Sequence, residues 1–308
     1  MHGIVYKSTG SWYLVKDEKG KVWNARMKGV FKLEGITSTN PVAVGDVVEF
    51  EKESSNDAAV IISAIRERKN YINRQSPRIK SQQHIVAANI DQSLLIATLK
   101  EPRTSPGFID RFLVTCEMYH VKAMVMFNKT DLYKEKELLK LEKLKSVYEK
   151  IGYTVIETSL TGKGIEDQIK DVLKDKITLV SGHSGVGKST FINTILPEGN
   201  LKTQDVSGWS GKGQHTTTFA EMFDLPFGGS IIDTPGMKEF GIIGVEKQEL
   251  SGYFPEMRLR LKNCQFNDCL HINEPGCAIK AAVVAGEIDE DRYVSYYNIL
   301  ESLDGKKW

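Results

Sequence analysis

Gly182-His183-Ser184-Gly185-Val186-Gly187-Lys188-Ser189 follows the apolar run Ile177–Val180 and precedes a stretch that is expected to be helical up to Pro197. It fits G-x-x-x-x-G-K-S, and a strand before it and a helix after it are the context that identifies a phosphate-binding loop, or P-loop. In such a loop, backbone N–H groups and the helix N-terminus face the phosphates. Lys188 adds a positive charge at the β- and γ-phosphates, and the Ser189 hydroxyl can bind Mg²⁺. The segment predicts an α/β P-loop domain.

A second motif, Asn128-Lys129-Thr130-Asp131, follows the apolar run Val121–Phe127. The Asp131 carboxylate can accept hydrogen bonds from guanine N1–H and the 2-amino group together, and adenine does not offer this pair of donors. The stem of Lys129 can lie against the base or the ribose, and Thr158–Leu160 would support the base from the other side. The motif therefore predicts GTP over ATP and disfavours a P-loop ATPase with a zinc-finger DNA domain.

The order of the two motifs is the reverse of that in ordinary GTPases, where the phosphate loop precedes the guanine loop. From about residue 84 to 242, expected strands and helices alternate, as a mostly parallel sheet requires. The buried strand expected at Ser93–Thr98 is one of them. All parts of a GTPase are thus present, but the chain enters the domain at a different point, which predicts a circularly permuted GTPase.

Two further segments are expected to respond to the γ-phosphate. Asp233-Thr234-Pro235-Gly236 begins 44 residues after Ser189, at the end of an expected strand. There Asp233 can hold Mg²⁺ directly or through water, and the Gly236 N–H can sense the γ-phosphate. The glycine-rich segment 208–218 is typical of a switch I loop, in which Thr217 or Thr216 would complete the Mg²⁺ shell.

Met237 stands where Ras-like enzymes carry the glutamine that positions the attacking water. Methionine cannot orient a water molecule, so either hydrolysis is slow or His215 or a partner supplies the missing group. The predicted magnesium ligands are Ser189, Thr217 and Asp233. The predicted GTP-binding residues are Asn128, Lys129, Thr130, Asp131, Thr158, Ser159, Leu160, Gly182, His183, Ser184, Gly185, Val186, Gly187, Lys188, Ser189, Thr190, Asp233 and Gly236.

A metal-binding pattern, C-x₄-C-x-H-x₅-C, lies near the C-terminus and comprises Cys264, Cys269, His271 and Cys277. Three thiolates and one imidazole satisfy tetrahedral Zn²⁺ and leave no open position, which favours a structural over a catalytic role. The alternative is a set of free thiols, but the chain has only one other cysteine, Cys116, which is expected in the core.

Length and composition set the remaining expectations. The 308 residues are 41% hydrophobic and 26% charged, with a net charge of +1, so any nucleic-acid contact must come from local patches. No apolar run approaches the roughly 20 residues that span a bilayer, and no signal peptide is recognisable, so a cytoplasmic location is expected. The expected parts are an all-β barrel of the OB type or a generic β-domain at 1–67, a basic linker at 68–83, the GTPase domain at 84–242 and an α-rich zinc-binding domain at 243–308.

These residues resemble the RsgA family, bacterial circularly permuted GTPases that depend on the small ribosomal subunit. The resemblance covers essentially the whole chain. It rests on the permuted order and on five segments: Phe108-Ile109-Asp110-Arg111-Phe112, Gly211-Lys212-Gly213-Gln214-His215-Thr216-Thr217-Thr218, Asp233–Gly236, Glu239-Phe240, and Glu274-Pro275-Gly276-Cys277-Ala278.

The resemblance implies an N-terminal OB-fold, a central GTPase domain and a C-terminal zinc domain. It further implies late maturation of the small (30S) ribosomal subunit, slow intrinsic GTP hydrolysis stimulated by that subunit, and contact with its rRNA. The histidine that matches His215 would position the water. One structural Zn²⁺ and Mg²⁺ with GTP are the expected cofactors, and a monomer without membrane contact is expected. The alternative is a GTP-gated rRNA-binding module in which hydrolysis is incidental.

Overall fold

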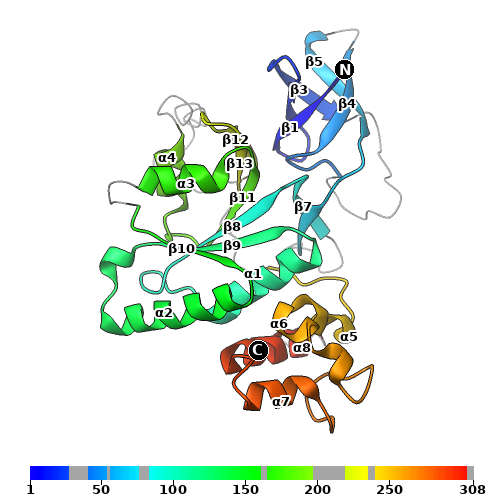
Figure 1. Cartoon of the computed structure of the whole chain (residues 1–308). Helices are drawn as coiled ribbons and strands as arrows, with labels where there is room; N and C mark the ends of the chain where they lie inside the picture. Colours follow the sequence, from blue (N-terminus) through cyan, green and yellow to red (C-terminus); the bar gives the residue numbers. More distant parts are fainter. Residues whose placement is uncertain are drawn as a thin grey trace.

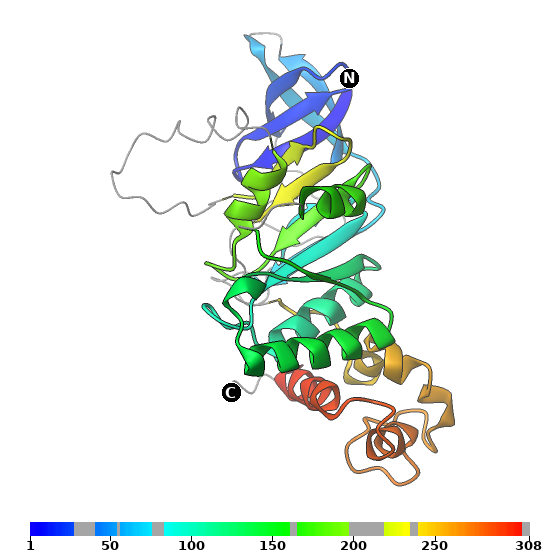
Figure 2. The same ribbon diagram turned by 60° about the vertical axis from the view of Figure 1, so that its left-hand side comes forward.

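The computed structural model describes residues 1–27, 41–53, 56–75, 83–160, 165–196, 219–234 and 240–303. A β-barrel, a helix-covered sheet and a helical body follow one another along the chain (Figure 1). Figure 2 shows them stacked in this order, with the barrel at one end and the helical body at the other.

The barrel is built from five strands that close on themselves, which confirms the predicted OB-type architecture. Neighbouring strands pair in the order β1-β2-β3-β5-β4, and β4 returns to β1 through Gly3 and Val48. Alternate residues such as Val5, Tyr13 and Val15 point into its core, as the period of a half-buried strand requires. The strands are β1 (His2–Ser8), β2 (Tyr13–Asp17), β3 (Val22–Met27), β4 (Val47–Glu53) and β5 (Asn56–Ile65).

The central sheet has the strand order β10-β9-β8-β11-β13-β12, and all neighbours are parallel except β12 and β13. Every residue of β8 is buried, as predicted for a strand covered on both faces. The strands are β8 (Gln92–Ala97), β9 (Lys122–Phe127), β10 (Thr154–Glu157), β11 (Ile177–Ser181), β12 (Glu221–Asp224) and β13 (Ser230–Asp233).

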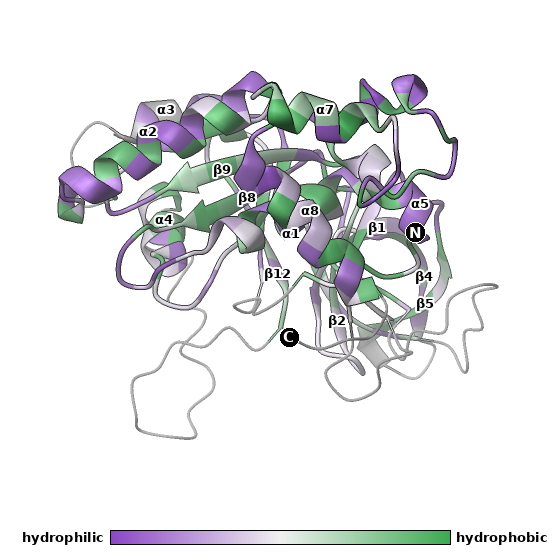
Figure 3. Ribbon diagram, turned by 90° about the horizontal axis from the view of Figure 1, so that it is seen from below, coloured by the Kyte–Doolittle hydropathy of each residue, from purple (hydrophilic) through white to green (hydrophobic). Residues whose placement is uncertain are grey.

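Two pairs of helices cover the two faces of this sheet (Figure 1). One apolar cluster joins α1 and α2 to one face, and a second joins α3 and α4 to the other. In Figure 3, β8 and β9 are coloured hydrophobic, whereas α2 alternates between hydrophilic and hydrophobic residues. The helices are α1 (Pro106–Met118), α2 (Glu135–Lys150), α3 (Ile165–Leu173) and α4 (Lys188–Ile195), with a short 3-10 helix η1 (Thr130–Leu132) after β9.

The barrel and the central sheet form one continuous sheet, which was not predicted from the sequence. Strand β1 pairs with β12 at Lys7 and Glu221, and the Lys7 Nζ lies 2.8 Å from the Glu221 Oε2. Beside this pair, the Tyr6 hydroxyl donates to the Asp224 Oδ1 at 2.6 Å, and Lys16 forms an ion pair with the same carboxylate. The barrel is therefore attached to the edge of the sheet by backbone and side chains together.

The segment predicted as a basic linker contains regular structure. Strand β6 (Tyr71–Gln75) lies inside it, and β7 (Gln83–Ala88) pairs with β6 in an antiparallel hairpin. Arg68, which begins this segment, is largely buried. Its Nε and Nη2 donate to the two oxygens of the buried Asp46 at 2.6 and 2.7 Å. A basic run in the sequence does not show which of its charges has a buried partner.

The C-terminal body consists of short helices around one apolar cluster, to which Val114 of α1 contributes. Within the described ranges, no helix has the length and apolar character needed to cross a bilayer. The helices are α5 (Lys247–Leu250), η3 (Ser251–Tyr253), α6 (Pro255–Arg258), η4 (Leu261–Asn263), α7 (Ala278–Val284) and α8 (Glu290–Leu303).

Candidate nucleotide site and metal centre

The predicted nucleotide loops all follow the carboxyl ends of neighbouring parallel strands. Asn128–Asp131 follows β9, Thr158–Leu160 follows β10, the P-loop follows β11, and Asp233 ends β13. Together with β8, which lies between β9 and β11, these strands form one parallel run, so segments that are far apart in the sequence meet at one edge of the sheet.

The side chain of Asn128 joins three of these loops. Its Nδ2 donates to the Val186 carbonyl of the P-loop at 2.8 Å, and its Oδ1 accepts from the Leu160 N–H at 3.2 Å. Asn128 is only 3% exposed, so both hydrogen bonds lie away from water. The amide therefore fixes the guanine loop against the phosphate loop and against the third loop.

Asp131, the predicted guanine acceptor, is exposed and is oriented by its neighbours. The Ser159 hydroxyl donates to the Asp131 Oδ1 at 2.6 Å, and the Thr130 N–H donates to the Thr158 carbonyl at 3.2 Å. Lys129 adopts a left-handed backbone conformation (φ 63°), and its Nζ donates to the Glu101 carbonyl at 2.7 Å. The predicted guanine residues thus form a turn whose position is set from several sides.

The P-loop has two positions that only glycine fits. A Cβ atom on Gly182 would lie 2.4 Å from the Ile96 carbonyl oxygen, and one on Gly187 would lie 2.4 Å from the Asn128 Nδ2. Both residues have positive φ, 148° and 104°, which L side chains rarely adopt. Helix α4 begins directly after Gly187, so its N-terminal N–H groups face the loop.

Lys188 lies over the P-loop. Its Nζ donates to the Gly182 and His183 carbonyls at 2.8 and 3.1 Å. Burial lowers the pKa of Lys188, and the negative charge of Asp233 partly offsets this effect. A partly desolvated ammonium group next to loop carbonyls is well suited to bind phosphate oxygens. Ser184, Ser189 and Thr190 are exposed around the same helix start.

Asp233 is 7% exposed at the end of β13, and the next residue, Thr234, donates its hydroxyl to the Val180 carbonyl at 3.0 Å. This bond ties the start of the predicted γ-phosphate-responsive segment Asp233–Gly236, the second switch, to β11, the strand that precedes the P-loop. Several predicted residues lie outside the described ranges: Gly236 and Met237 of this switch, and His215, Thr216 and Thr217 of the first.

Helix α1 contacts the P-loop, a contact that was not predicted from the sequence. The Phe108 and His183 rings lie with their centroids 3.9 Å apart, and Phe240 lies 5.2 Å from both Phe108 and Phe112. Ser105 starts this helix by accepting the Phe108 N–H, and Pro106 occupies its first position. Burial, together with the charge of Lys188, lowers the pKa of His183.

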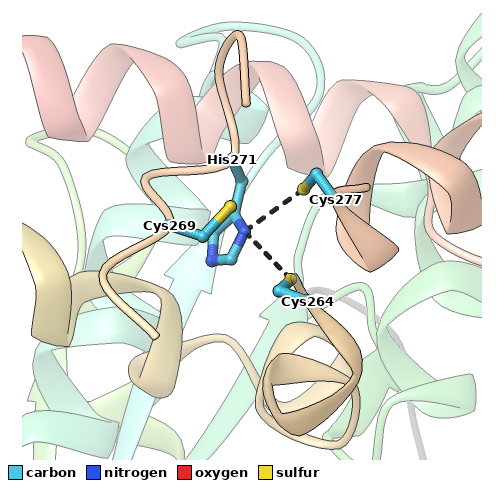
Figure 4. Close-up of side chains that lie close together, drawn as sticks. All are labelled: Cys264, Cys269, His271 and Cys277. Atoms are coloured by element: carbon cyan, nitrogen blue, oxygen red, sulfur yellow. Dashed lines mark hydrogen bonds between the residues drawn. The ribbon is translucent and has the colours of Figure 1, made fainter. Parts of the chain in front are cut away.

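The four predicted zinc ligands converge in the C-terminal body (Figure 4). Their ligand atoms all lie within 4.8 Å of one another, and the His271 Nδ1 lies 3.7 Å from the Cys264 Sγ and 3.4 Å from the Cys277 Sγ. Such a cluster of three sulfurs and one nitrogen fits a tetrahedral zinc ion. Cys116 is fully buried in a different apolar cluster, as expected of a core residue.

Residues around the cluster hold the loop that carries Cys269 and His271. The Glu274 carboxylate accepts from the Leu270 and Ile272 N–H groups, both at 2.8 Å. From α8, the Tyr293 and Tyr296 hydroxyls donate to the His271 and Leu270 carbonyls at 2.6 and 2.8 Å. These two tyrosines, which pack in the apolar cluster of the C-terminal body, therefore also position the ligand loop.

Comparisons with known proteins cover the whole chain. The family described as RsgA GTPase matches residues 65–243, and the RsgA N-terminal domain matches residues 2–60. A "Small ribosomal subunit biogenesis GTPase RsgA" of Flavobacterium johnsoniae is 52% identical over 303 residues, which are 98% of this chain and 93% of the relative. A protein of the same name from Bacteroides fragilis is 48% identical over 309 residues, 100% of this chain and 99% of the relative.

Two solved structures are similar over nearly their full length. YjeQ from Thermotoga maritima has a TM-score of 0.77 and 34% identity, and the match covers 99% of each chain. YloQ, described as a circularly permuted GTPase, has a TM-score of 0.73 and 29% identity, covering 100% of this chain and 96% of its own. The likeness therefore extends over the barrel, the central sheet and the C-terminal body.

Proposed function

The chain belongs to the RsgA family of GTPases, and from this premise we infer that it hydrolyses GTP in the biogenesis of the small ribosomal subunit. The geometric observation that supports this function best is the buried Asn128 amide, which joins the guanine loop to the phosphate loop. The relatives are named as GTPases, which favours the enzyme over an RNA-binding module with incidental hydrolysis.

We propose that Asp131 reads the guanine base while Lys129 and Thr158–Leu160 enclose it. The P-loop N–H groups and Lys188 hold the β- and γ-phosphates, since both lie at the start of α4. The support for this assignment is the common edge of the sheet at which these loops meet.

We propose that Ser189 and Asp233 hold Mg²⁺, with Thr217, or alternatively Thr216, added from the first switch. The carboxylate and hydroxyl oxygens of these residues suit this ion. When bound, Mg²⁺ neutralises charge that develops on the phosphate oxygens. The Gly236 N–H would sense the γ-phosphate. Because Met237 cannot orient water, His215 is the proposed residue for that task, and slow intrinsic hydrolysis follows from the missing glutamine.

In the C-terminal body, we propose one structural zinc ion held by Cys264, Cys269, His271 and Cys277. Their mutual distances and soft donors support this metal, and the complete set of protein ligands supports a structural role. The proposed domains are the barrel at 1–67, the GTPase domain at 84–242 and the zinc domain at 243–308. We further propose that the two flanking domains contact the rRNA of the small subunit, and that the protein is a cytoplasmic monomer.

The test is GTP turnover by the purified protein with and without small ribosomal subunits. Strong stimulation that His215→Ala loses, but that His120→Asn, at an exposed position just after α1, keeps, would support the proposed function and the role of His215. Binding of the subunit without any stimulation would contradict the enzymatic function and support a GTP-gated RNA-binding module.

A further inference from the structure

A buried hydroxyl, that of Tyr133, lies behind the guanine loop. Tyr133 directly follows η1 and is 8% exposed. Its hydroxyl accepts from the Leu99 N–H and donates to the Asn128 carbonyl, both at 2.8 Å. The hydroxyl group therefore donates one hydrogen bond and accepts another, and both partners are backbone groups.

These two backbone groups belong to different strand ends. Leu99 lies just after β8 and Asn128 just after β9, so the hydroxyl connects the segment after one strand to the guanine loop that follows the next. The same segment after β8 also provides the Glu101 carbonyl, which accepts from the Lys129 Nζ. Residues 99–101 thus hold the turn 128–131 through two contacts, the Tyr133 hydroxyl between Leu99 and Asn128 and the Lys129 side chain on Glu101.

The position of the Asn128 backbone determines what its side chain reaches. The carbonyl is held by Tyr133 on one side, while the amide bonds to Val186 and Leu160 on the other. Burial raises the pKa of the Tyr133 hydroxyl to about 12, so it stays protonated and remains a donor at physiological pH. If this hydroxyl were removed, the Leu99 N–H and the Asn128 C=O would each lose a partner, and the turn would be expected to shift to satisfy them.

We propose that Tyr133 is a positioning residue for guanine recognition, whose hydroxyl sets the turn 128–131 so that Asp131 meets the base. The inference rests on the proposed function, because it requires Asp131 to be the guanine acceptor. It assigns the effect to the hydroxyl rather than to the ring, which belongs to the apolar cluster beneath α1 and α2.

The test compares the affinities of Tyr133→Phe and wild-type protein for GDP, IDP and inorganic pyrophosphate by calorimetry. Hypoxanthine lacks the 2-amino group that Asp131 would bind, and pyrophosphate lacks the base altogether. We expect GDP affinity to fall roughly 10- to 100-fold, because two buried backbone groups lose their partner, while pyrophosphate affinity falls much less. The preference for GDP over IDP should shrink accordingly.

Tyr148→Phe is the matched control, because the Tyr148 hydroxyl is also buried but donates to Asp110 in α1. It should leave all three affinities unchanged. An equal loss of all three ligands in Tyr133→Phe would indicate a merely structural role and overturn the inference.

Asp131→Asn separates failure of the inference from failure of the proposed function. If this variant loses its guanine preference but Tyr133→Phe keeps wild-type affinities, only the inference is wrong. If Asp131→Asn retains the guanine preference, the guanine assignment fails and the inference with it. Should Tyr133→Phe not fold, hydrogen exchange of the wild-type Leu99 amide decides: stronger protection by GDP than by pyrophosphate supports the inference, and equal protection contradicts it.

Discussion

Asp110 of α1 and Arg292 of α8 form a buried ion pair, with 2.8 Å between the Asp110 Oδ1 and the Arg292 Nη1. Both are at most 2% exposed, and the guanidinium also binds the Glu256 carboxylate at 2.8 Å. Two residues before Asp110, Phe108 contacts His183 of the P-loop. Helix α1 therefore contacts the phosphate loop with one residue and the C-terminal body with another.

Replacement of Arg292 by methionine should lower the free energy of unfolding by about 3–5 kcal/mol, because it leaves two carboxylates buried without their cation. Lys143→Met is the matched control. Lys143 joins α2 to Asp291 of α8, but the side chains of this pair are 54% and 63% exposed, so a loss below about 1 kcal/mol is expected. Denaturant unfolding measures both variants, and equal losses would contradict a special role for the buried pair.

Removal of the metal should unfold the C-terminal body while the barrel remains folded. Cys269→Ser takes one sulfur from the proposed closed ligand set. Native mass spectrometry should therefore find one zinc ion on the purified wild type and none on the variant. Cys116→Ala removes a thiol from a different cluster and should retain the metal. A Cys269→Ser protein with full zinc content would show that the ion is held elsewhere.

Gly187→Ala should weaken GDP binding at least about 100-fold, since its Cβ would displace the Asn128 amide that joins the loops. Gly152→Ala provides the comparison. Gly152 has a similar φ, 98° against 104°, but a Cβ there meets no atom within 4 Å. Both substitutions place alanine at a positive φ, so Gly152→Ala controls for a general loss of stability, and the loss of GDP affinity in Gly187→Ala is assigned to the phosphate loop. Similar GDP affinities of Gly187→Ala and Gly152→Ala would contradict the proposed role of the Asn128 amide in joining the loops.

The junction of barrel and sheet should weaken in acid. Partial burial alone would raise the pKa of Asp224, but hydrogen bonds from Lys16, Tyr6 and Ser230 outweigh it and hold the pKa below the ordinary 3.8. A lowered folded-state pKa gives stability that is present above about pH 4 and is lost as the pH falls through the folded value. The carboxylate is partly exposed, so the loss should not exceed about 1 kcal/mol.

Unfolding measured between pH 5 and pH 3 should therefore show a steeper decline for the wild type than for Asp224→Asn. Asp167→Asn, whose carboxylate is 92% exposed, should decline as the wild type does. Parallel curves for all three proteins would exclude Asp224 as the source of the pH dependence.

A flexible insertion at Gly244 should uncouple ribosome affinity from nucleotide state, because the second switch leads into the C-terminal body through a short connection. Gly244 has positive φ and no neighbour that a Cβ would meet within 4 Å, so the insertion itself should be tolerated. Affinity for small subunits is measured with GDP and with a non-hydrolysable GTP analogue. If the dependence of ribosome affinity on nucleotide state survives the insertion but is lost in Arg292→Met, the coupling runs through α1 instead.

The sequence was sufficient to predict the central domain because each nucleotide loop follows an apolar strand, and parallel strands place such loops at one edge. It also predicted the cysteine–histidine cluster, since three thiols and one imidazole within 14 residues match the ligand set of a structural zinc ion. It could not predict that Lys7 meets Glu221, because no local pattern states which strand edge a barrel will cover. Nor did it reveal Tyr133: its only signal is a tyrosine two residues after Asp131 whose hydroxyl, if buried, must find a partner.

The pairing of β1 with β12 also affects how the molecule can be dissected. An uncovered edge strand presents a row of unsatisfied backbone groups to any other strand in solution. The barrel covers the β12 edge of the GTPase sheet in this way. A fragment that starts after residue 67 would therefore lose more than a proposed RNA-contacting domain. It would also expose the unpaired edge of β12, and its aggregation could be mistaken for a loss of function.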